Sequence, residues 1–284
     1  MVKKIINTIL YSNIFIGACA VALTFTNQLI VEGQIHFDSN CWFILFSTIF
    51  TYSYLKAIST SGATHHTSHR DWATENPQLS KNILLISAIG AAAFFFELNT
   101  DAKVVVFILA IVTAFYGFFE IPFIKPKKKL RDLGLVKTVF VGIVWSATTV
   151  LVPLAQSHIQ TDLMIFLLLR RFLFLLALTM VFEIKDMEGD AANNLETLPL
   201  AIGIPNTKLL AQGILFAMII INLIQYFFFY IPFVNMVAVN LSLLVSIICI
   251  QPVNEQTGEK WYYIVLDGMM ILQFIFVYIA AKYF

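Results

Sequence analysis

Residues Leu163–Asp190 read LMIFLLLRRFLFLLALTMVFEIKDMEGD, and this stretch decides the fold class of the chain. The run Leu163–Ile184 is almost entirely apolar, and about 20 such residues in a helix span the hydrocarbon core of a bilayer. The run ends in oxygen-bearing side chains at intervals of three or four residues: Glu183, Asp186, Asp190 and Asn194. If the helix continues, this spacing places all four on one face. The stretch therefore predicts a membrane-spanning helix with a row of polar ligands at one end.

Composition extends this prediction to the whole chain. Of its 284 residues, 59% are hydrophobic and 12% are charged, whereas soluble chains are about half apolar and about a quarter charged. Long apolar runs alternate with short polar ones, which is typical of an all-α polytopic membrane bundle, here a single integral-membrane domain over residues 1–284. A net charge of +1 offers no basic domain for nucleic acid. Three separated cysteines indicate neither a disulfide framework nor a zinc site.

The apolar runs predict about nine transmembrane helices. Their limits are Ile5–Val31, Cys41–Ile58, Asn82–Leu98, Val104–Phe123, Leu135–Ala155, Leu163–Ile184, Lys208–Tyr230, Phe233–Ile250 and Trp261–Tyr283. The division between the seventh and eighth helices rests on Ile231-Pro232 alone. The first apolar run continues past the length of a signal-peptide core, so we expect it to remain uncleaved.

The distribution of positive charge predicts the orientation. With the N-terminus in the cytoplasm, fourteen Lys and Arg residues lie in cytoplasmic segments and only Lys103 and Lys282 lie outside. This positive-inside bias predicts a protein of the bacterial inner membrane with residues 59–81, 125–137 and 183–207 on the cytoplasmic side. A single functional site is then expected at the cytoplasmic mouth of the bundle. Attraction to anionic membrane lipids is sufficient to explain most of the lysines in segment 125–137.

The acids that end the sixth span are candidate ligands for a divalent cation. Carboxylate and amide oxygens suit Mg²⁺, which keeps some of its waters and shares substrate phosphates. A solvated helix end is the alternative interpretation, but acids this close to a membrane carry more weight. A cation held there would bind a diphosphate, and its candidate ligands are Glu183, Asp186, Glu188, Asp190 and Asn194.

The same stretch resembles a known family. The run Glu183-x-x-Asp186-x-x-Gly189-Asp190, followed by Thr197-Leu-Pro199 and Gly203, is similar to the second aspartate-rich motif of UbiA-type intramembrane prenyltransferases. That family has nine transmembrane helices, with cytoplasmic aspartate-rich motifs after the second and the sixth. Tyr116 with the basic segment 126–132 resembles the family's tyrosine-and-basic stretch, and Gly134–Pro153 resembles its fifth helix. The resemblance covers nearly the whole chain in topology and is motif-specific from Tyr116 to Gly203.

This resemblance implies a reaction. A polyprenyl diphosphate would ionise with the help of Mg²⁺, and a lipophilic acceptor, often an aromatic ring, would attack the prenyl group. It implies Asp186, Asp190 and Lys137 as catalytic residues and Glu183, Asp186 and Asp190 as metal ligands. The expected substrate-binding residues are Lys56, Tyr116, Arg131, Lys137, Trp145 and Asn194.

The family's first motif is absent. Residues Thr51–Thr60, TYSYLKAIST, carry no acid where three acidic or amide residues are expected, and Lys56 lies about where a carboxylate belongs. Lys56 would then act as a fixed positive charge in place of a metal. Alternatively, ligands would come from the loop that follows, which is otherwise a polar connector. Its candidates are His65, His66, His69, Asp71 and Glu75.

Three functions remain open. The first is the transferase; the second is a non-catalytic protein that binds a prenyl lipid or quinone, supported by the missing motif. The third is a small-solute transporter, weakened by the lack of matching Gly/Pro-broken helices. Asp71 or Glu75 folded opposite Asp186 would favour catalysis, and Lys56 with hydroxyl groups alone would favour the binding protein. Of Arg170 and Arg171 in the sixth span, one is expected to face the bundle interior.

Overall fold

A computed structural model of the protein describes residues 2–59, 68–118, 133–155, 157, 159–192, 195–229 and 231–283. The prediction of an all-α fold is confirmed for this part of the chain. The elements are α1 (Val2–Tyr11), α2 (Ile14–Glu32), α3 (Ser39–Ser59), α4 (Ser68–Glu75), α5 (Pro77–Glu97), α6 (Thr100–Phe118), α7 (Gly134–Leu154), α8 (Thr161–Ala192), α9 (Leu198–Ile202), α10 (Ile204–Phe229), α11 (Phe233–Ile250), the π-helix η2 (Trp261–Leu266) and α12 (Gly268–Tyr283).

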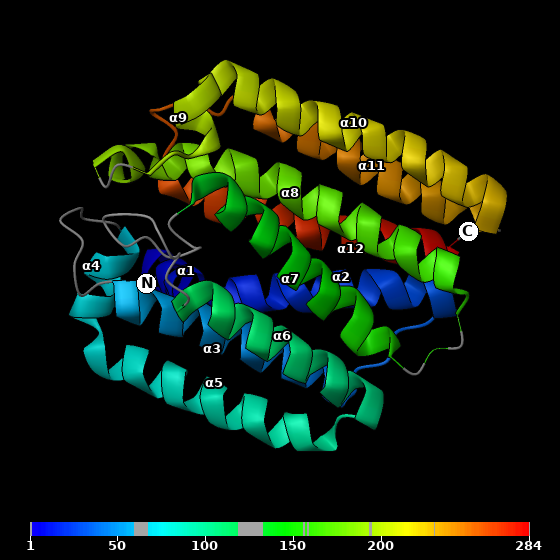
Figure 1. The fold of residues 1–284 in the computed structure, drawn as a ribbon, viewed down its shortest axis with the longest axis horizontal. Helices are drawn as coiled ribbons and strands as arrows, with labels where there is room; N and C mark the ends of the chain where they lie inside the picture. The colour runs from blue at the N-terminus through cyan, green and yellow to red at the C-terminus, as the bar shows by residue number, and fades with distance from the viewer. Residues whose placement is uncertain are drawn as a thin grey trace.

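The long helices of the described chain lie roughly parallel to one another along the longest axis of the molecule (Figure 1). One lies on each predicted span, and α11 begins and ends at the predicted residues Phe233 and Ile250. Seven of these helices are long and apolar enough to cross a bilayer. The other two are α3 and α6, which lie on the predicted spans 41–58 and 104–123. The N- and C-termini lie at opposite ends of the bundle (Figure 1), as an odd number of crossings requires.

Two predicted spans differ from the observed helices in ways that affect the site. The span Ile5–Val31 is divided into α1 and α2, because Asn13 adopts a left-handed conformation with φ of 64° that interrupts the helix. The sixth span continues past Ile184 to Ala192. Lys, Asp, Glu and Ala all tolerate helical geometry, and the one glycine in the extension, Gly189, costs only about 1 kcal/mol relative to alanine.

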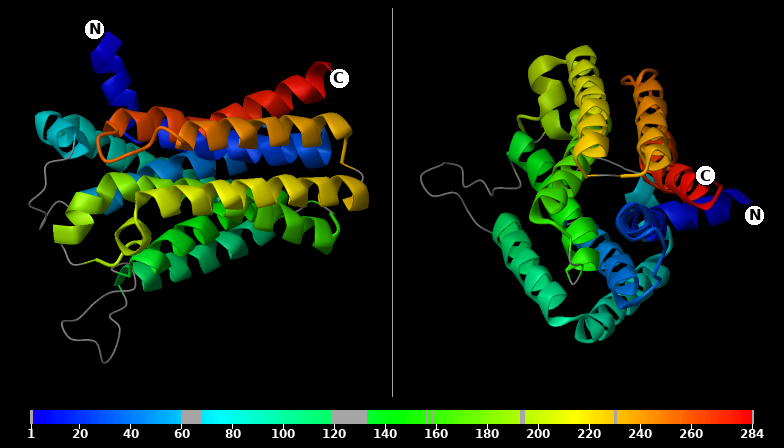
Figure 2. Two further views of the ribbon diagram at one scale, coloured as in Figure 1. Left: turned by 90° about the horizontal axis from the view of Figure 1, so that it is seen from above. Right: turned by 90° about the vertical axis from the view of Figure 1, so that its right-hand side faces the viewer.

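The helices form a circuit around the bundle axis. Contacts connect α2 to α3 and α3 to α5, then run from α6 through α7, α8, α10 and α11 to α12, which returns to α2. The right-hand view of Figure 2 follows this arrangement from one end. Helix α7 also contacts α2 and α3 across the bundle. Helix α8 is the longest and packs against α7, α9, α10 and η2, so it is held along its length.

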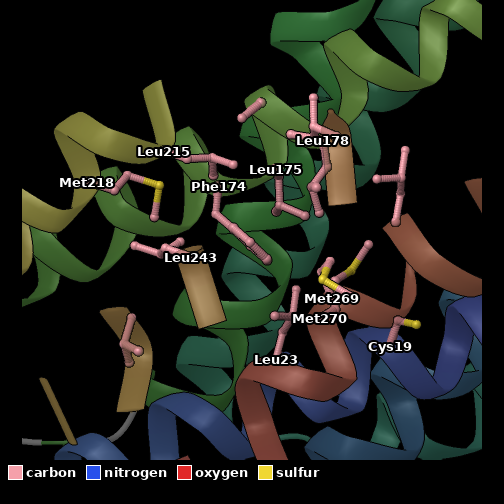
Figure 3. Packing of buried hydrophobic residues seen from close by; sticks show 14 of the residues in the cluster. Cys19, Leu23, Phe174, Leu175, Leu178, Leu215, Met218, Leu243, Met269 and Met270 are labelled. Atoms are coloured by element: carbon pink, nitrogen blue, oxygen red, sulfur yellow. The ribbon is translucent and has the colours of Figure 1, made fainter. Parts of the chain in front are cut away.

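Apolar side chains fill the space between α8 and the C-terminal helices. Phe174 of α8 and Met218 of α10 meet Leu243 of α11, Met269 of α12 and Leu23 of α2 in one buried cluster (Figure 3). Such close packing fixes the position and the rotation of α8. The polar C-terminal turns of α8 are thereby placed at one end of the bundle. We call this end of the bundle the site end. Helices α4 and α9 and the C-terminal end of α3 lie there too (Figure 1).

Both arginines of α8 are buried, which corrects the expectation that one of them faces the interior. The Nη1 of Arg170 donates to Gln225 of α10 at 3.2 Å, while Arg171 donates to Gln273 of α12 and to Asn27 of α2 at 3.2 and 2.9 Å. The reason is that other helices pack against α8 on several sides. Adjacent side chains of α8 that point in different directions are therefore both buried against protein. These arginines join α8 to three neighbouring helices.

Candidate functional site

The last turns of α8 carry the three predicted metal ligands. The helix continues through all of them, as the spacing predicts. Glu183 and Asp190 are buried, with 2% and 8% of their surface exposed, whereas Asp186 is half-buried. Asp190 interacts electrostatically with both other acids. Asn194, the fourth member of the predicted set, lies outside the described residues.

Two carboxylate oxygens in this group are buried without a partner. They are Oε2 of Glu183 and Oδ2 of Asp190, which accept no hydrogen bond within the described part of the chain. The other Glu183 oxygen accepts a hydrogen bond from Thr138 Oγ1 on α7. Lys137, next to Thr138, interacts electrostatically with both acids. A buried carboxylate oxygen left unpaired costs free energy, which a bound cation would offset.

The donor set fits Mg²⁺ in a particular way. The described residues hold no group of three or more His, Cys, Asp or Glu side chains that converge on one point, so the three predicted acids are not assembled as a complete cage. Mg²⁺ is usually held by only one or two protein carboxylates, together with waters and substrate phosphates. The buried oxygens of Glu183 and Asp190 fit this requirement, with Asp186 beside them. An ion held there would therefore keep positions free for waters or for the oxygens of a ligand.

Two lysines lie beside the same tyrosine ring at the site end. Lys185 of α8 pairs with Asp186 at 2.8 Å, and its Nζ lies 3.3 Å from the hydroxyl of Tyr263 on η2. The Nζ atoms of Lys185 and Lys56 are 5.2 and 5.9 Å from the centroid of the Tyr263 ring. Lys56 also interacts electrostatically with Asp186. Lys56 of α3 therefore lies close to the acidic turns of α8.

Asn13 holds Lys56 in this position. The Nζ of Lys56 donates to Oδ1 of Asn13 at 2.6 Å, and Nδ2 of Asn13 donates to Oγ of Ser53 at 2.9 Å. Asn13 is the left-handed residue between α1 and α2, and asparagine adopts this conformation more readily than most residues. Sequence reasoning misses Asn13. The polar pair Ser12-Asn13 within an apolar run was the available signal.

Asp267 is the second residue that sequence reasoning misses. It follows the π-helix η2, is 7% exposed, and interacts electrostatically with Lys56 and Lys185. The signal was an acid inside the predicted span 261–283, because ionisable residues within spans are costly and often functional. π-helical turns also occur frequently at functional sites. Asp71 and Glu75, the acids whose position opposite Asp186 would favour catalysis, are exposed on α4.

The predicted aromatic residues lie on α6 and α7. Trp145 of α7 donates from Nε1 to the hydroxyl of Tyr52 on α3 at 3.1 Å, and Tyr52 lies one turn before Lys56. Tyr116 of α6 stacks on Phe140 of α7, with centroids 3.8 Å apart and planes at 8°. Trp145 is thus joined to the helix that carries Lys56, whereas Tyr116 packs at the α6–α7 contact. Some predicted residues lie outside the described part of the chain: Arg131, His65, His66 and the side chain of His69.

Two cavities lie at the opposite end of the bundle. Their volumes are about 500 and 430 Å³. The larger is lined by polar side chains that include Glu32, His36 and Asp38, and the carboxylate of Glu32 accepts a hydrogen bond from Ser157 at 3.0 Å. These residues connect helices at their far ends. The length of the bundle separates them from the acidic turns of α8.

The chain is similar to known proteins in sequence and in fold. In sequence, the model of the UbiA prenyltransferase family matches residues 62–275. In fold, a structure described as digeranylgeranylglyceryl phosphate synthase in membranes gives a TM-score of 0.59 at 12% identity, over 98% of this chain and 99% of that chain. A UbiA homolog from Aeropyrum pernix K1 gives 0.58 at 8% identity, over 93% and 96%. Curated protein sequences give no match. Because the family match covers most of its length, the chain belongs to the UbiA prenyltransferase family.

Proposed function

We propose that this chain moves a polyprenyl group from its diphosphate to a lipophilic acceptor, with an aromatic ring as the favoured acceptor class. The observation that carries the proposal is that acidic and basic side chains lie close together at the site end. Unpaired buried oxygens of Glu183 and Asp190 can take a cation, and the ammonium groups of Lys56 and Lys185 lie close by. A metal-bound diphosphate needs both kinds of group. The positive-inside bias supports placing this end on the cytoplasmic side of the membrane, which we infer to be a bacterial inner membrane.

Each group has a separate task in this proposal. Glu183, Asp186 and Asp190 would hold Mg²⁺, which neutralises charge on the leaving diphosphate. Lys137 on α7 and Arg131 just before it would donate to phosphate oxygens. Lys56 would supply a positive charge from α3, the helix whose end carries no acidic motif. The site would then combine one metal position with a fixed cation.

Ionisation creates charge on the prenyl group as well. The allylic C–O bond breaks and its electron pair leaves with the diphosphate, so a positive charge develops on the prenyl carbons. The rings of Tyr52, Trp145 and Tyr116 are candidates to stabilise it, since aromatic faces attract cations. The acceptor then forms the new bond to the prenyl carbon and releases a proton. The apolar bundle excludes water, which would otherwise capture the cation as a prenyl alcohol.

A specific observation favours a second candidate, a non-catalytic protein that binds a prenyl lipid or quinone. Asp186 is already paired with Lys185 at 2.8 Å. A carboxylate engaged in an ion pair is a weaker metal ligand, and the first acidic motif is missing. A protein of this kind would retain lipid binding without breaking the C–O bond.

The test uses purified protein in nanodiscs with labelled geranylgeranyl or farnesyl diphosphate, with and without Mg²⁺. Binding and release of diphosphate are followed for the native chain and for Asp190→Asn. Glu188→Gln is the matched control, because Glu188 is an exposed acid two residues away. Mg²⁺-dependent release that is lost only in Asp190→Asn supports the transferase. Binding without release supports the second candidate, and absence of binding contradicts the transferase.

A further inference from the structure

Helix α1 leaves the bundle sideways. The left-hand view of Figure 2 shows it at the site end, projecting across the direction of the long helices. Its main contacts are with α2, to which it is joined, and with α4. The turn at Asn13 produces this change of direction. A ten-residue helix is too short to span a bilayer, which takes about 20 residues.

The two sides of α1 differ in character. Tyr11 is buried beside Trp72 of α4, and its ring meets the edge of Tyr263 with centroids 6.1 Å apart. Ile5, Ile6 and Ile9 are exposed by 53%, 39% and 40%. At the 3.6-residue period of a helix these three isoleucines share one face, and Tyr11 lies on the opposite one. The apolar face therefore points away from α4.

We propose that this apolar face lies on the membrane, with α1 in the plane of the interface, and that the lipids it binds carry anionic headgroups. An amphipathic helix with lysines on its polar side binds a bilayer in this way. The sequence of α1 contains Lys3 and Lys4 and no acid, and anionic lipids attract such lysines. Ile14, at the start of α2, is also exposed. The apolar surface of α1 thus continues onto a helix that enters the membrane.

The interface contact has a consequence for the site end. Asn13 is the turn between α1 and α2, and its amide receives the ammonium group of Lys56. A helix fixed on the lipid surface would restrain this turn from outside the bundle. The membrane contact itself does not depend on the proposed transferase activity. Its test can therefore succeed or fail independently of that function.

The test measures the depth of α1 in the full-length protein. Spin labels are placed at Ile5→Cys and Ile9→Cys, with Lys4→Cys as the matched control, because Lys4 is also exposed but lies on the polar face. The background carries Cys249→Ser, since Cys19 and Cys41 are buried. Accessibility to oxygen, which concentrates in lipid, is compared with accessibility to a water-soluble nickel complex. Nanodiscs contain phosphatidylcholine alone or mixed with phosphatidylglycerol.

We expect labels at positions 5 and 9 to favour oxygen and the label at position 4 to favour nickel. Phosphatidylglycerol should increase severalfold the difference in the oxygen-to-nickel accessibility ratio between positions 5 and 9 and position 4. Added salt should reverse that increase. Equal nickel access at all three positions would place α1 in water and overturn the proposal. Oxygen access at all three would mean that α1 inserts into the bilayer, which also overturns it. A contrast that is the same in both lipid mixtures would reject the preference for anionic headgroups.

Discussion

The Nζ of Lys56 lies 2.6 Å from Oδ1 of Asn13, so the turn between α1 and α2 positions a charge on α3. The partner is a neutral amide, which satisfies one donor of the ammonium group without cancelling its charge. Within the described part of the chain, its two other donors make no hydrogen bond, so they remain for a ligand. Lys56 is therefore suited to bind an anion while being held in place by the protein.

Replacing Lys56 tests this role directly. Lys56→Met keeps the length and flexibility of the side chain and removes the charge. We expect the affinity for inorganic diphosphate to fall by about 10- to 100-fold, because a hydrogen bond to a charged group contributes roughly 1.5–3 kcal/mol. Calorimetric titration at saturating Mg²⁺ measures the change, with Lys56→Arg as the charge-preserving control. Unchanged affinity in Lys56→Met would reject Lys56 as a binding residue.

Two substitutions of Asn13 distinguish the effect of its backbone conformation from the effect of its side-chain amide. Asn13→Gly preserves the left-handed turn and deletes the amide, whereas Asn13→Ala deletes the amide and strains the backbone by about 1–2 kcal/mol. Both variants should bind diphosphate less tightly, by about three- to tenfold, because Lys56 loses its positioning partner. Only Asn13→Ala should also unfold at a clearly lower temperature. If Asn13→Gly binds as the native chain does, the amide does not position Lys56.

A glycine packs against the segment that follows the acidic turns. A Cβ added at Gly134, the first residue of α7, would lie 2.3 Å from the carbonyl oxygen of Glu196 and 2.6 Å from Cα of Thr197. Both atoms belong to the backbone, so Gly134→Ala must displace α7 or residues 195–197. Because Thr138 and Lys137 lie on the next turn, we expect weaker diphosphate binding as well as a lower unfolding temperature.

The matched control is Gly213→Ala in α10, where nothing lies within 4 Å of the added Cβ. Alanine should stabilise this exposed helical position by up to about 1 kcal/mol. Thermal unfolding in detergent and diphosphate titration distinguish the two variants. Equal behaviour of Gly134→Ala and Gly213→Ala would contradict the close contact.

Hydropathy predicts the helices because each span must satisfy its own backbone hydrogen bonds within lipid. For this reason Phe233–Ile250 is correct at both ends. The same method cannot see the turn at Asn13, because one left-handed residue scarcely changes the mean apolarity of Ile5–Val31. Hydropathy also cannot locate the end of α8, because apolarity falls at Lys185 whereas the helix continues to Ala192, as the spacing of the acids predicts.

The site is predictable only where its residues share one helix. Glu183, Asp186 and Asp190 follow from their spacing. The contacts of Lys56 depend on tertiary packing, because its neighbours Asn13 and Asp267 are separated from it by many residues and lie on other elements. No periodic pattern in a single sequence records such contacts. Asp267 was missed, and the one sequence feature that could have indicated it is an isolated acid within an apolar run.

Asp267 gives the last prediction, whose direction is opposite to that for Lys56. Asp267→Asn keeps the shape of the side chain and removes the carboxyl group that interacts electrostatically with Lys56 and Lys185. Two unit charges about 10–15 Å apart interact by roughly 1–2 kcal/mol at an effective dielectric constant of about 20. At an alkaline pH that ionises Asp267 in the native chain, inorganic diphosphate should therefore bind about five- to tenfold more tightly to this variant.

Performing the same diphosphate titration with and without Mg²⁺ identifies the role of Asp267. Tighter binding in both conditions means that Asp267 only balances the two lysines in the empty site, and that its charge opposes the anion. Weaker binding confined to the Mg²⁺ condition would instead make Asp267 a cation ligand, supplied from η2 and α12 on the side where the acidic motif is missing. Weaker binding in both conditions would mean that Asp267 orients Lys56. Since the three outcomes differ in sign or in metal dependence, one substitution distinguishes whether this protein binds diphosphate with one metal position or with two.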